Sequence, residues 1–250
     1  MTNIISDRWI ATFLGTVPPE QTAREIAFLC DVLPLFTHPR LLDVCCGDGR
    51  HARPLALAGY AVTAVDAHPT LIERARARWR KEDARALSDA DETDPRAPAF
   101  HVQDMRALDE LDDAFDGLTC LWSSFGYFDS ATNDAVLATM ARRVRAGGRI
   151  VLDVYHRGFF ARHEGERRIE RAGQTVLERK SLDGDVLTVR LSYGDGEDDV
   201  FRWQIFAPEE LAGRAAACGL DPVLQCAGFD RATAPSPELP RMQLVLERHR

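Results

Sequence analysis

Short apolar runs alternate with helix-patterned segments between residues 20 and 155, and this alternation constrains the fold of the chain most. Apolar runs predict strands at 41–46, 61–65, 99–103, 115–121 and 150–155. Amphipathic spacing predicts helices at 20–33, 50–58, 70–81 and through 136–144, where Gly147-Gly148 is expected to end the last one. Strands that are apolar along their whole length need cover on both faces. We therefore expect an α/β fold with a doubly wound parallel sheet and right-handed crossovers.

The pattern changes after residue 164. Turn signals at Asp183-Gly184 and Gly194-Asp195-Gly196 separate runs in which apolar and polar residues alternate. This predicts a small antiparallel sheet with one dry and one wet face. The dry face over 186–206 either covers an active site or lies in a dimer interface, so the oligomeric state stays open. The runs that predict these strands are 176–182, 186–193 and 200–206, followed by a helix over 208–219 and strands at 222–228 and 242–247.

Charge and hydropathy exclude several kinds of partner. The 250 residues contain 31 Lys and Arg against 39 Asp and Glu, a net charge of −8, which disfavours binding to a nucleic acid backbone. The apolar stretch Trp9–Val17 is too short to cross a membrane. Because no small-residue cleavage site follows it, we interpret the stretch as mature protein rather than a signal peptide.

Cysteine and histidine spacing gives no sign of metal or disulfide chemistry. The six cysteines form no CxxC pattern, and the seven histidines form no HxxxH or HExxH pair. We expect the thiols to be small buried hydrophobes in a cytoplasmic protein, and we expect no metal site. The polar segment 82–98, with two prolines, is expected to be a solvated loop.

Acidic residues and glycines follow the predicted parallel strands at the edge where such sheets bind ligands. Asp43 precedes a turn that contains Gly47 and Gly49, Asp66 ends the second strand, and Asp104 follows the third. The glycines let backbone amides approach a ligand closely. A carboxylate at the second strand end accepts ribose hydroxyls, and one after the third accepts an adenine amino group. Together they indicate an adenosine-bearing ligand.

A dinucleotide is the competing ligand, because residues 47–52 match G-x-G-x-x-A. Asp48, however, places a carboxylate inside the turn where a pyrophosphate needs amides. About 40 residues of helical material precede the first strand, and Asp104 adds an acidic group for the adenine edge. An adenosine ligand without phosphates fits these residues better.

The chain resembles class I S-adenosylmethionine (SAM)-dependent methyltransferases over roughly residues 20–155. The resemblance rests on segments 41–69, 100–108, 115–128 and 147–155. Segment 123–128, SSFGYF, is similar to bacterial small-molecule enzymes such as aminosugar N,N-dimethyltransferases and lincosamide N-methyltransferases. The resemblance implies a Rossmann-like core and divides the chain into an N-terminal helical cap or lid (1–36), a SAM-binding core (37–160), an antiparallel β insertion (161–207) and a C-terminal part of the core sheet (208–250).

The resemblance also implies which residues hold SAM. The usual residue at position 45 in this family is glycine, so Cys45 narrows the floor of the pocket. The implied cofactor contacts are Asp43, Cys45, Gly47 and Gly49 around the methionine part, Asp66 at the ribose, Ala67, Asp104 and Met105 around the adenine, the Leu121 carbonyl, and Trp9 on the N-terminal segment.

Candidate residues near the acceptor are chosen because they lie at predicted strand ends, on the lid or in the insertion. His156 is the preferred general base, because its titration range suits neutral pH, and Tyr127 is the second catalytic candidate. Arg50 either reaches the SAM carboxylate or lies at the surface, and His51 is equally suited to starting a helix. The expected substrate contacts are Phe13, Phe125, Tyr155 and Trp203.

The leading functional hypothesis is methyl transfer from SAM to a nitrogen or an oxygen of a small metabolite, in natural-product biosynthesis. Alignment of nucleophile, methyl carbon and sulfur would drive the reaction. Two alternatives stay open: a non-catalytic SAM-binding partner protein, and a nicotinamide-dependent oxidoreductase. The acceptor cannot be read from the sequence, because the lid and the insertion carry no motif.

Overall fold

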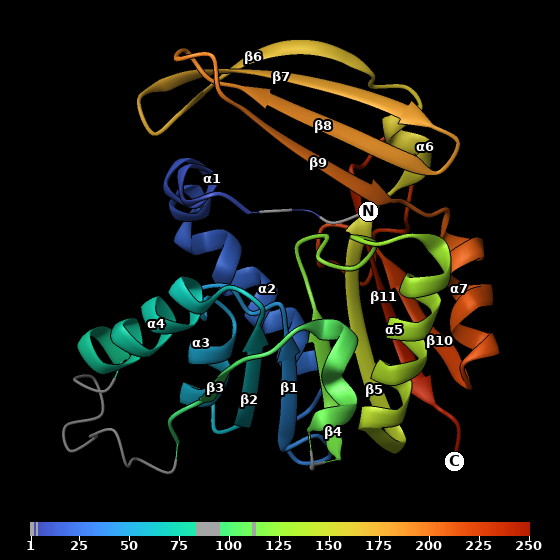
Figure 1. Cartoon of the computed structure of the whole chain (residues 1–250). Coiled ribbons are helices and arrows are strands. Elements are labelled where there is room, and N and C mark those ends of the chain that lie inside the picture. Colours follow the sequence, from blue (N-terminus) through green and yellow to red (C-terminus); the bar gives the residue numbers. More distant parts are fainter. Residues whose placement is uncertain (1–2, 4, 84–95, 112–113) are drawn as a thin grey trace.

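A seven-stranded sheet forms the centre of the molecule in the computed structural model, which describes residues 3, 5–83, 96–111 and 114–250 (Figure 1). Its strand order is β10-β11-β5-β4-β1-β2-β3. Strands β1 to β5 pair with one another in parallel, whereas β11 is antiparallel to β5 and to β10. The strands are β1 (Arg40–Val44), β2 (Ala61–Asp66), β3 (Ala99–Val102), β4 (Phe115–Cys120), β5 (Val144–Tyr155), β10 (Leu220–Cys226) and β11 (Arg241–Arg248).

The chain reverses its direction across the sheet beside β1. From β1 it proceeds through β2 to β3 on one side, and it then returns to β4 and β5 on the other. The carboxyl ends of β1 and β4 therefore flank the switch point where open α/β sheets bind ligands. The doubly wound α/β fold expected from the sequence is confirmed.

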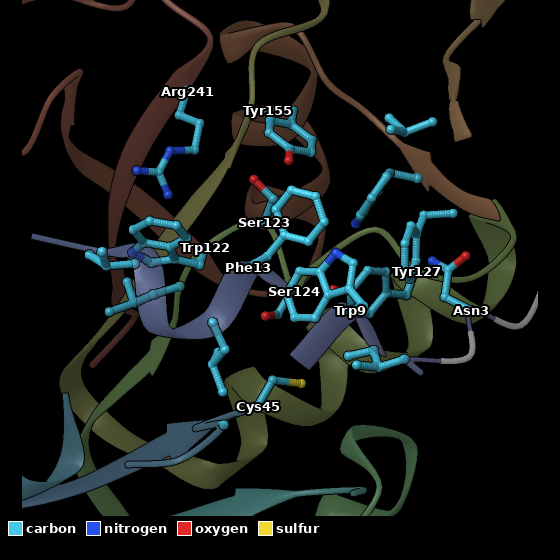
Figure 2. A pocket seen from close by; sticks show the side chains of 18 of the residues that line it. Asn3, Trp9, Phe13, Cys45, Trp122, Ser123, Ser124, Tyr127, Tyr155 and Arg241 are labelled. Atoms are coloured by element: carbon cyan, nitrogen blue, oxygen red, sulfur yellow. The ribbon is translucent and has the colours of Figure 1, made fainter. Parts of the chain in front are cut away.

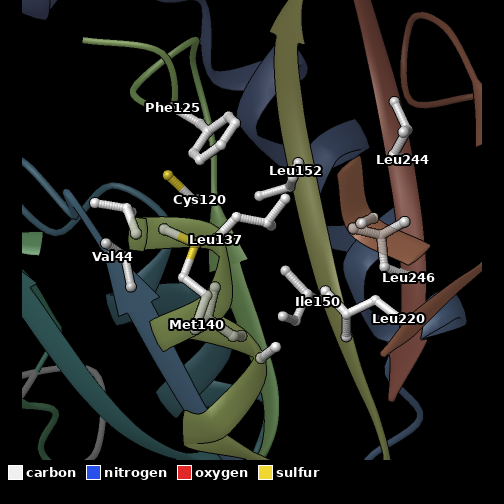
Figure 3. Close-up of a cluster of buried hydrophobic side chains, with 14 of the residues drawn as sticks. Val44, Cys120, Phe125, Leu137, Met140, Ile150, Leu152, Leu220, Leu244 and Leu246 are labelled. Carbon is white, nitrogen blue, oxygen red and sulfur yellow. The ribbon is translucent and has the colours of Figure 1, made fainter. Parts of the chain in front are cut away.

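Helices cover both faces of the central sheet and enclose two apolar cores. One core joins α5 and α7 to the strands, with Leu137 and Met140 of α5 against Ile150 of β5 (Figure 3). The other core joins α2, α3 and α4 to the opposite face. The helices are α2 (Pro19–Val32), α3 (Ala52–Leu57), α4 (Pro69–Arg78), α5 (Ser130–Arg143) and α7 (Pro208–Ala217), with a π turn at Trp79–Asp83 and a 3₁₀ turn at Met105–Glu110. Among the described residues, no helix is both long and apolar enough to cross a membrane.

A second, four-stranded antiparallel sheet, called the cover sheet below, lies over the carboxyl ends of the central strands (Figure 1). Its hairpins and its dry face, with Leu187, Val189 and Trp203 buried, confirm the antiparallel prediction. The cover sheet consists of β6 (Gly165–Arg171), β7 (Gln174–Asp183), β8 (Val186–Ser192) and β9 (Asp198–Gln204), and α6 (Arg157–Phe160) leads into it from β5.

The N-terminal segment is attached to the cover sheet. Helix α1 (Asp7–Phe13), continued by a 3₁₀ turn at Leu14–Thr16, begins at the N-cap Ser6. Ser6 Oγ donates to Asp199 Oδ2 (2.8 Å), and Arg8 Nη1 donates to Asp195 Oδ1 (2.8 Å). These bonds place α1 and β9 on the same side of the molecule.

Three local predictions differ from the structure. Strand β1 ends at Val44 rather than at residue 46, because Cys45 turns to φ +58°. Helix α5 ends at Arg143, and Gly147-Gly148 lie inside β5. A Cβ on Gly148 would lie 2.5 Å from the Asp116 carbonyl oxygen, so Gly148 allows a close approach of β5 to β4 where the register shifts. Strand β6 was not predicted, because its sequence GERRIER is polar and most of its residues are exposed. The loop expected at 82–98 falls largely on 84–95, outside the described residues.

Candidate functional site

A cavity of about 1660 Å³ lies between the carboxyl edge of the central sheet and the dry face of the cover sheet. Its lower wall comes from the turns that follow β1, β2, β3 and β4, and its upper wall from α1, α6 and the cover sheet (Figure 2). Because the dry face lines this cavity through Val189, Phe201 and Trp203, the cover sheet shields the site. Asp43, Asp66 and Asp104 all line it, so the structure brings the three predicted acidic residues together.

Asp43 presents an unsatisfied carboxylate oxygen to the cavity. Its side chain is 2% exposed, and Oδ1 accepts a hydrogen bond from Thr119 Oγ1 (2.8 Å). Oδ2 is buried and has no hydrogen-bond partner among the described residues. Burial raises the pKa of Asp43 to about 7, against the lowering effects of Thr119 and Arg50. A buried acceptor without a partner indicates a ligand that brings a donor or a positive charge.

The turn after β1 is held open by left-handed backbone conformations. Gly47 has φ +57°, and a Cβ at this position would meet no atom within 4 Å, so its backbone faces open space at the cavity. Gly49 has a different role and does not line the cavity. With φ +78°, it lies so close to α4 and β3 that a Cβ would approach Phe100 (3.1 Å) and Ala75 (3.2 Å). Gly49 therefore serves helix packing.

Asp66 ties the end of β2 to the turn after β1. Its Oδ2 accepts from the Gly47 amide (3.0 Å) and its Oδ1 from the His68 amide (2.8 Å). Burial raises the pKa of Asp66, while these two amides oppose the rise. Each oxygen keeps a further lone pair for a ligand hydroxyl, since an ionised carboxylate accepts about four hydrogen bonds. Ala67 follows it in the cavity wall.

Asp104 and Met105 form the wall at the end of β3. Asp104 accepts from both the backbone and the guanidinium of Arg106, and the latter bonds hold the pKa of this carboxyl below its usual range. Met105 Sδ lies 3.8 Å from Cys45 Sγ, so the thiol of Cys45 reaches across the floor of the cavity. The Arg106 guanidinium covers the Phe128 ring at 4.8 Å.

The upper part of the cavity is aromatic. Trp9 and Phe13 of α1 stack with their centroids 5.8 Å apart. Trp203 of β9 contacts Tyr127 (5.7 Å) and Tyr155 (5.5 Å), which lie after β4 and at the end of β5. Burial raises the pKa of both tyrosines, so neither hydroxyl ionises near neutral pH. Together with Leu121, these predicted residues line the cavity. We call them the aromatic wall, and Figure 2 shows Trp9, Phe13, Tyr127 and Tyr155 among them.

Besides Gly49, two more of the predicted site residues do not line the cavity. Phe125 is buried in the core against Phe206, with ring centroids 5.6 Å apart. His156 is 6% exposed, lies beside Gly158 and Pro237, and has a pKa lowered by burial. His156, the residue predicted as the base at the acceptor, follows β5 and is not among the residues that line the cavity.

Glu25 of α2 is a central residue that the sequence did not reveal. It is fully buried and accepts from Arg50 Nη1 (2.5 Å), His51 Nε2 (2.8 Å) and Trp122 Nε1 (3.1 Å). Burial opposes its ionisation, but His51 and Arg50 hold the pKa of Glu25 at about 2. Burial lowers the pKa of His51 to about 4, so this ring is neutral at pH 7 and donates its Nε2–H.

The position of Arg50 is also settled. It lies on the cavity wall and not at the surface, with its side chain 17% exposed, while His51 occupies the N-cap of α3.

Glu25 had no sequence signal, because it occurs within an ordinary amphipathic helix whose polar face normally meets water.

Comparisons with known proteins agree with this geometry. Residues 41–148 match a family model described as "Methyltransferase domain". Human glycine N-methyltransferase is 28% identical over 174 residues, which is 67% of this chain and 57% of that protein. A dTDP-3-amino-3,6-dideoxy-alpha-D-glucopyranose N,N-dimethyltransferase of Streptomyces fradiae is 28% identical over 61% of this chain and 55% of its own length. The chain thus matches about half the length of these curated relatives.

Solved structures extend the similarity of fold over nearly the whole chain. A SAM-dependent methyltransferase from Clostridium acetobutylicum has a TM-score of 0.77 at 15% identity and covers 97% of both chains. The CcbJ methyltransferase from Streptomyces caelestis has a TM-score of 0.74 at 18% identity, over 93% of this chain and 91% of its own. SAM-bound CalS10, an amino pentose methyltransferase from Micromonospora echinaspora, has a TM-score of 0.68 at 22% identity over 99% of both chains.

Proposed function

We propose that this chain, whose residues 41–148 match a methyltransferase domain model, is a class I methyltransferase that binds SAM and transfers its methyl group to an amino nitrogen of a small metabolite. The observation that carries the proposal is the meeting of Asp43, Asp66 and Asp104 around one cavity beside the open Gly47 turn. The relatives named as glycine and aminosugar N-methyltransferases support transfer to nitrogen.

The residues at the lower wall fit SAM. The unpartnered Asp43 oxygen suits the ammonium group of its methionine part, and the lone pairs of Asp66 suit its ribose hydroxyls. Ala67 and Met105 line the adenine part, with Asp104 at its amino edge, and Arg50 suits the methionine carboxylate. Bound SAM supplies a methyl group on a positively charged sulfur.

The aromatic wall positions the acceptor and excludes water. Rings such as Trp9 and Tyr127 stabilise a nearby cation by roughly 0.5–2 kcal/mol each. They also restrict the acceptor to one approach, and such alignment contributes roughly 7–11 kcal/mol to lowering the barrier. In this proposal α1 and the cover sheet select the acceptor, while the core of residues 37–160 binds the cofactor.

Nitrogen is favoured over oxygen by the proton chemistry of the aromatic wall. A hydroxyl acceptor needs a general base, whereas a neutral amine attacks without one. Tyr127 and Tyr155 keep their protons at neutral pH, and His156 lies outside the lining. Tyr127 therefore serves to position the acceptor, and the amine releases its proton to solvent. We place the reaction in natural-product biosynthesis, following the named roles of similar proteins.

Titration calorimetry and a turnover assay test this proposal. SAM is expected to bind to the whole chain and NAD⁺ is not, and amines are expected to release S-adenosylhomocysteine faster than alcohols of the same skeleton. NAD⁺ binding without SAM binding would overturn the cofactor. Tight SAM binding with no methylation across a broad panel of amines and alcohols would favour the non-catalytic SAM-binding protein.

A further inference from the structure

The loop after β4 fixes Trp122 in a strained position at the cavity wall. Trp122 and Ser123 have φ +58° and +59°, a region that side chains other than glycine rarely adopt. The Trp122 amide donates to Asp153 Oδ2 (2.9 Å), and its indole N–H donates to Glu25 Oε1 (3.1 Å). Both carboxylates are fully buried. Such strain persists where the surrounding structure enforces it, typically at ligand sites.

Two guanidinium groups lie against the Trp122 ring. Arg50 lies 4.5 Å and Arg241 4.4 Å from the ring centroid, and each bonds one of the two buried carboxylates. Figure 2 shows Arg241 directed toward Trp122, beside Tyr155. Both arginines line the cavity, with side chains 17% and 20% exposed. Burial lowers the pKa of Arg50, Glu25 opposes this lowering, and the nearby positive charge of Arg241 adds to it.

Asp153 does not use all of the hydrogen-bond donors of Arg241. Asp153 also accepts from the Trp122 amide and from Gln243 Nε2 (2.7 Å). In the described part of the chain, Arg241 reaches Asp153 through Nη1 alone (2.8 Å), although a guanidinium carries five N–H donors. Further donors of a cavity-lining guanidinium therefore remain for a ligand. The planar fork of arginine suits carboxylate and phosphate groups.

The two guanidiniums face different parts of the cavity. Arg50 follows the glycine turn and interacts electrostatically with Asp43, so it belongs to the cofactor end. Arg241 of β11 lies opposite Tyr155 of β5, so we assign it to the part of the cavity that is lined by aromatic residues. SAM has one carboxylate, and in the proposed function it lies at Arg50, so SAM does not occupy the remaining donors of Arg241.

We propose that Arg241 binds an anionic group of the methyl acceptor, so that the substrate is an amine bearing a carboxylate or a phosphate. This inference rests on the proposed function and narrows its substrate class. Arg241 then orients the amine toward the methyl group, and a neutral amine of the same skeleton leaves the guanidinium without its partner. A site built for a polar group rejects analogues that lack it.

Matched acceptor pairs test the assignment in the full chain. Glycine against glycinamide and β-alanine against its amide form the carboxylate arm. Phosphoethanolamine against ethanolamine and glucosamine 6-phosphate against glucosamine form the phosphate arm. We expect the anionic member of at least one pair to have a kcat/KM at least tenfold higher, measured by S-adenosylhomocysteine release.

Substitutions then separate Arg241 from the cofactor site. Arg241→Gln is expected to remove the anionic preference, mainly through KM, while the SAM dissociation constant stays within about threefold of its original value. Arg241→Lys is expected to keep part of the preference in the phosphate arm but little in the carboxylate arm, because lysine lacks the planar fork. Arg167→Gln is the control, because Arg167 lines the same cavity but pairs with Glu178 on the cover sheet.

Specific results would overturn the inference while leaving SAM binding intact. These are methylation of no anionic amine, equal turnover within all pairs, or an anionic preference that survives in Arg241→Gln. A large loss of SAM affinity in Arg241→Gln would also overturn it, since Arg241 would then serve the cofactor. Failure of the unmodified chain to bind SAM would instead contradict the proposed function.

Discussion

Asp66 holds two backbone amides and, in our proposal, the cofactor ribose. We expect Asp66→Ala to weaken SAM binding at least tenfold, because it removes the paired hydroxyl contact and loosens the Gly47 turn. Calorimetry on the purified variant measures this. Asp109→Ala is the control, because Asp109 pairs with Arg142 away from the cavity. Unchanged affinity in Asp66→Ala would remove this residue from the site.

Asp43 makes the stability of the ligand-free protein depend on pH. Its pKa in the fold, about 7, lies above the ordinary 3.8, so the fold favours the protonated form. The resulting stabilisation is fully present below about pH 4 and is lost as pH rises to about 7. Asp43→Asn removes this dependence. We expect the stability of the variant relative to the original to rise by roughly 2–3 kcal/mol between pH 5 and pH 8, since one pKa unit corresponds to about 1.4 kcal/mol.

Urea unfolding at several pH values measures that difference. A constant difference between Asp43→Asn and the original protein would contradict the raised pKa. Added SAM is expected to reduce the pH dependence, because its ammonium group stabilises the ionised form of Asp43.

At the level of single elements, the parallel strands were the most predictable part of the fold. Two-sided burial makes the inner strands nearly continuous apolar runs, as in 61–65, and acidic residues mark the ends of several of them. Strand β6 could not be found, because an exposed edge strand needs no apolar residues. The Arg50–Trp122–Arg241 arrangement was equally hidden, since it joins residues about 190 positions apart and depends on side-chain packing that no local pattern encodes.

The glycine pair in β5 shows that glycine can either end a helix or allow two strands to approach closely. Gly147-Gly148 suggested a helix end, but Gly148 is required where β5 crosses close to the Asp116 carbonyl. We expect Gly148→Ala to destabilise the protein by about 2 kcal/mol or more, because its Cβ would overlap backbone atoms. Gly213→Ala is the matched substitution in α7, where a Cβ meets nothing within 4 Å, and it should stabilise by about 0.5–1 kcal/mol. Thermal unfolding of both variants measures the expected loss of stability in Gly148→Ala and the expected gain in Gly213→Ala.

At the scale of the whole molecule, the proposed function divides cofactor binding and acceptor binding between two sheets. The central sheet carries the acidic strand ends, while α1 and the cover sheet carry Trp9, Phe13 and Trp203. The sequence predicted the first set by motif and the second only as aromatic residues of a lid and an insertion, because aromatic residues in ordinary packing look the same.

This division predicts distinct kinetic effects. We expect Trp203→Ala to raise the acceptor KM at least fivefold while SAM affinity changes less than twofold, because the ring contacts Tyr127 and Tyr155 and not the acidic wall. Steady-state kinetics with calorimetry in parallel measures both quantities. Phe125→Leu is the control aromatic substitution in the core. A loss of SAM binding in Trp203→Ala equal to the loss in acceptor binding would contradict the division.

The bonds from Ser6 to Asp199 of β9 and from Arg8 to Asp195 in the turn before β9 span 193 and 187 positions of sequence. During synthesis, Ser6 and Arg8 therefore leave the ribosome long before their partners Asp199 and Asp195. At about 5–20 residues per second this interval lasts roughly 10–40 seconds. The five parallel strands are made before then, but β10 and β11 follow, so a nascent chain can dock its N-terminal helix on the cover sheet before the central sheet is complete.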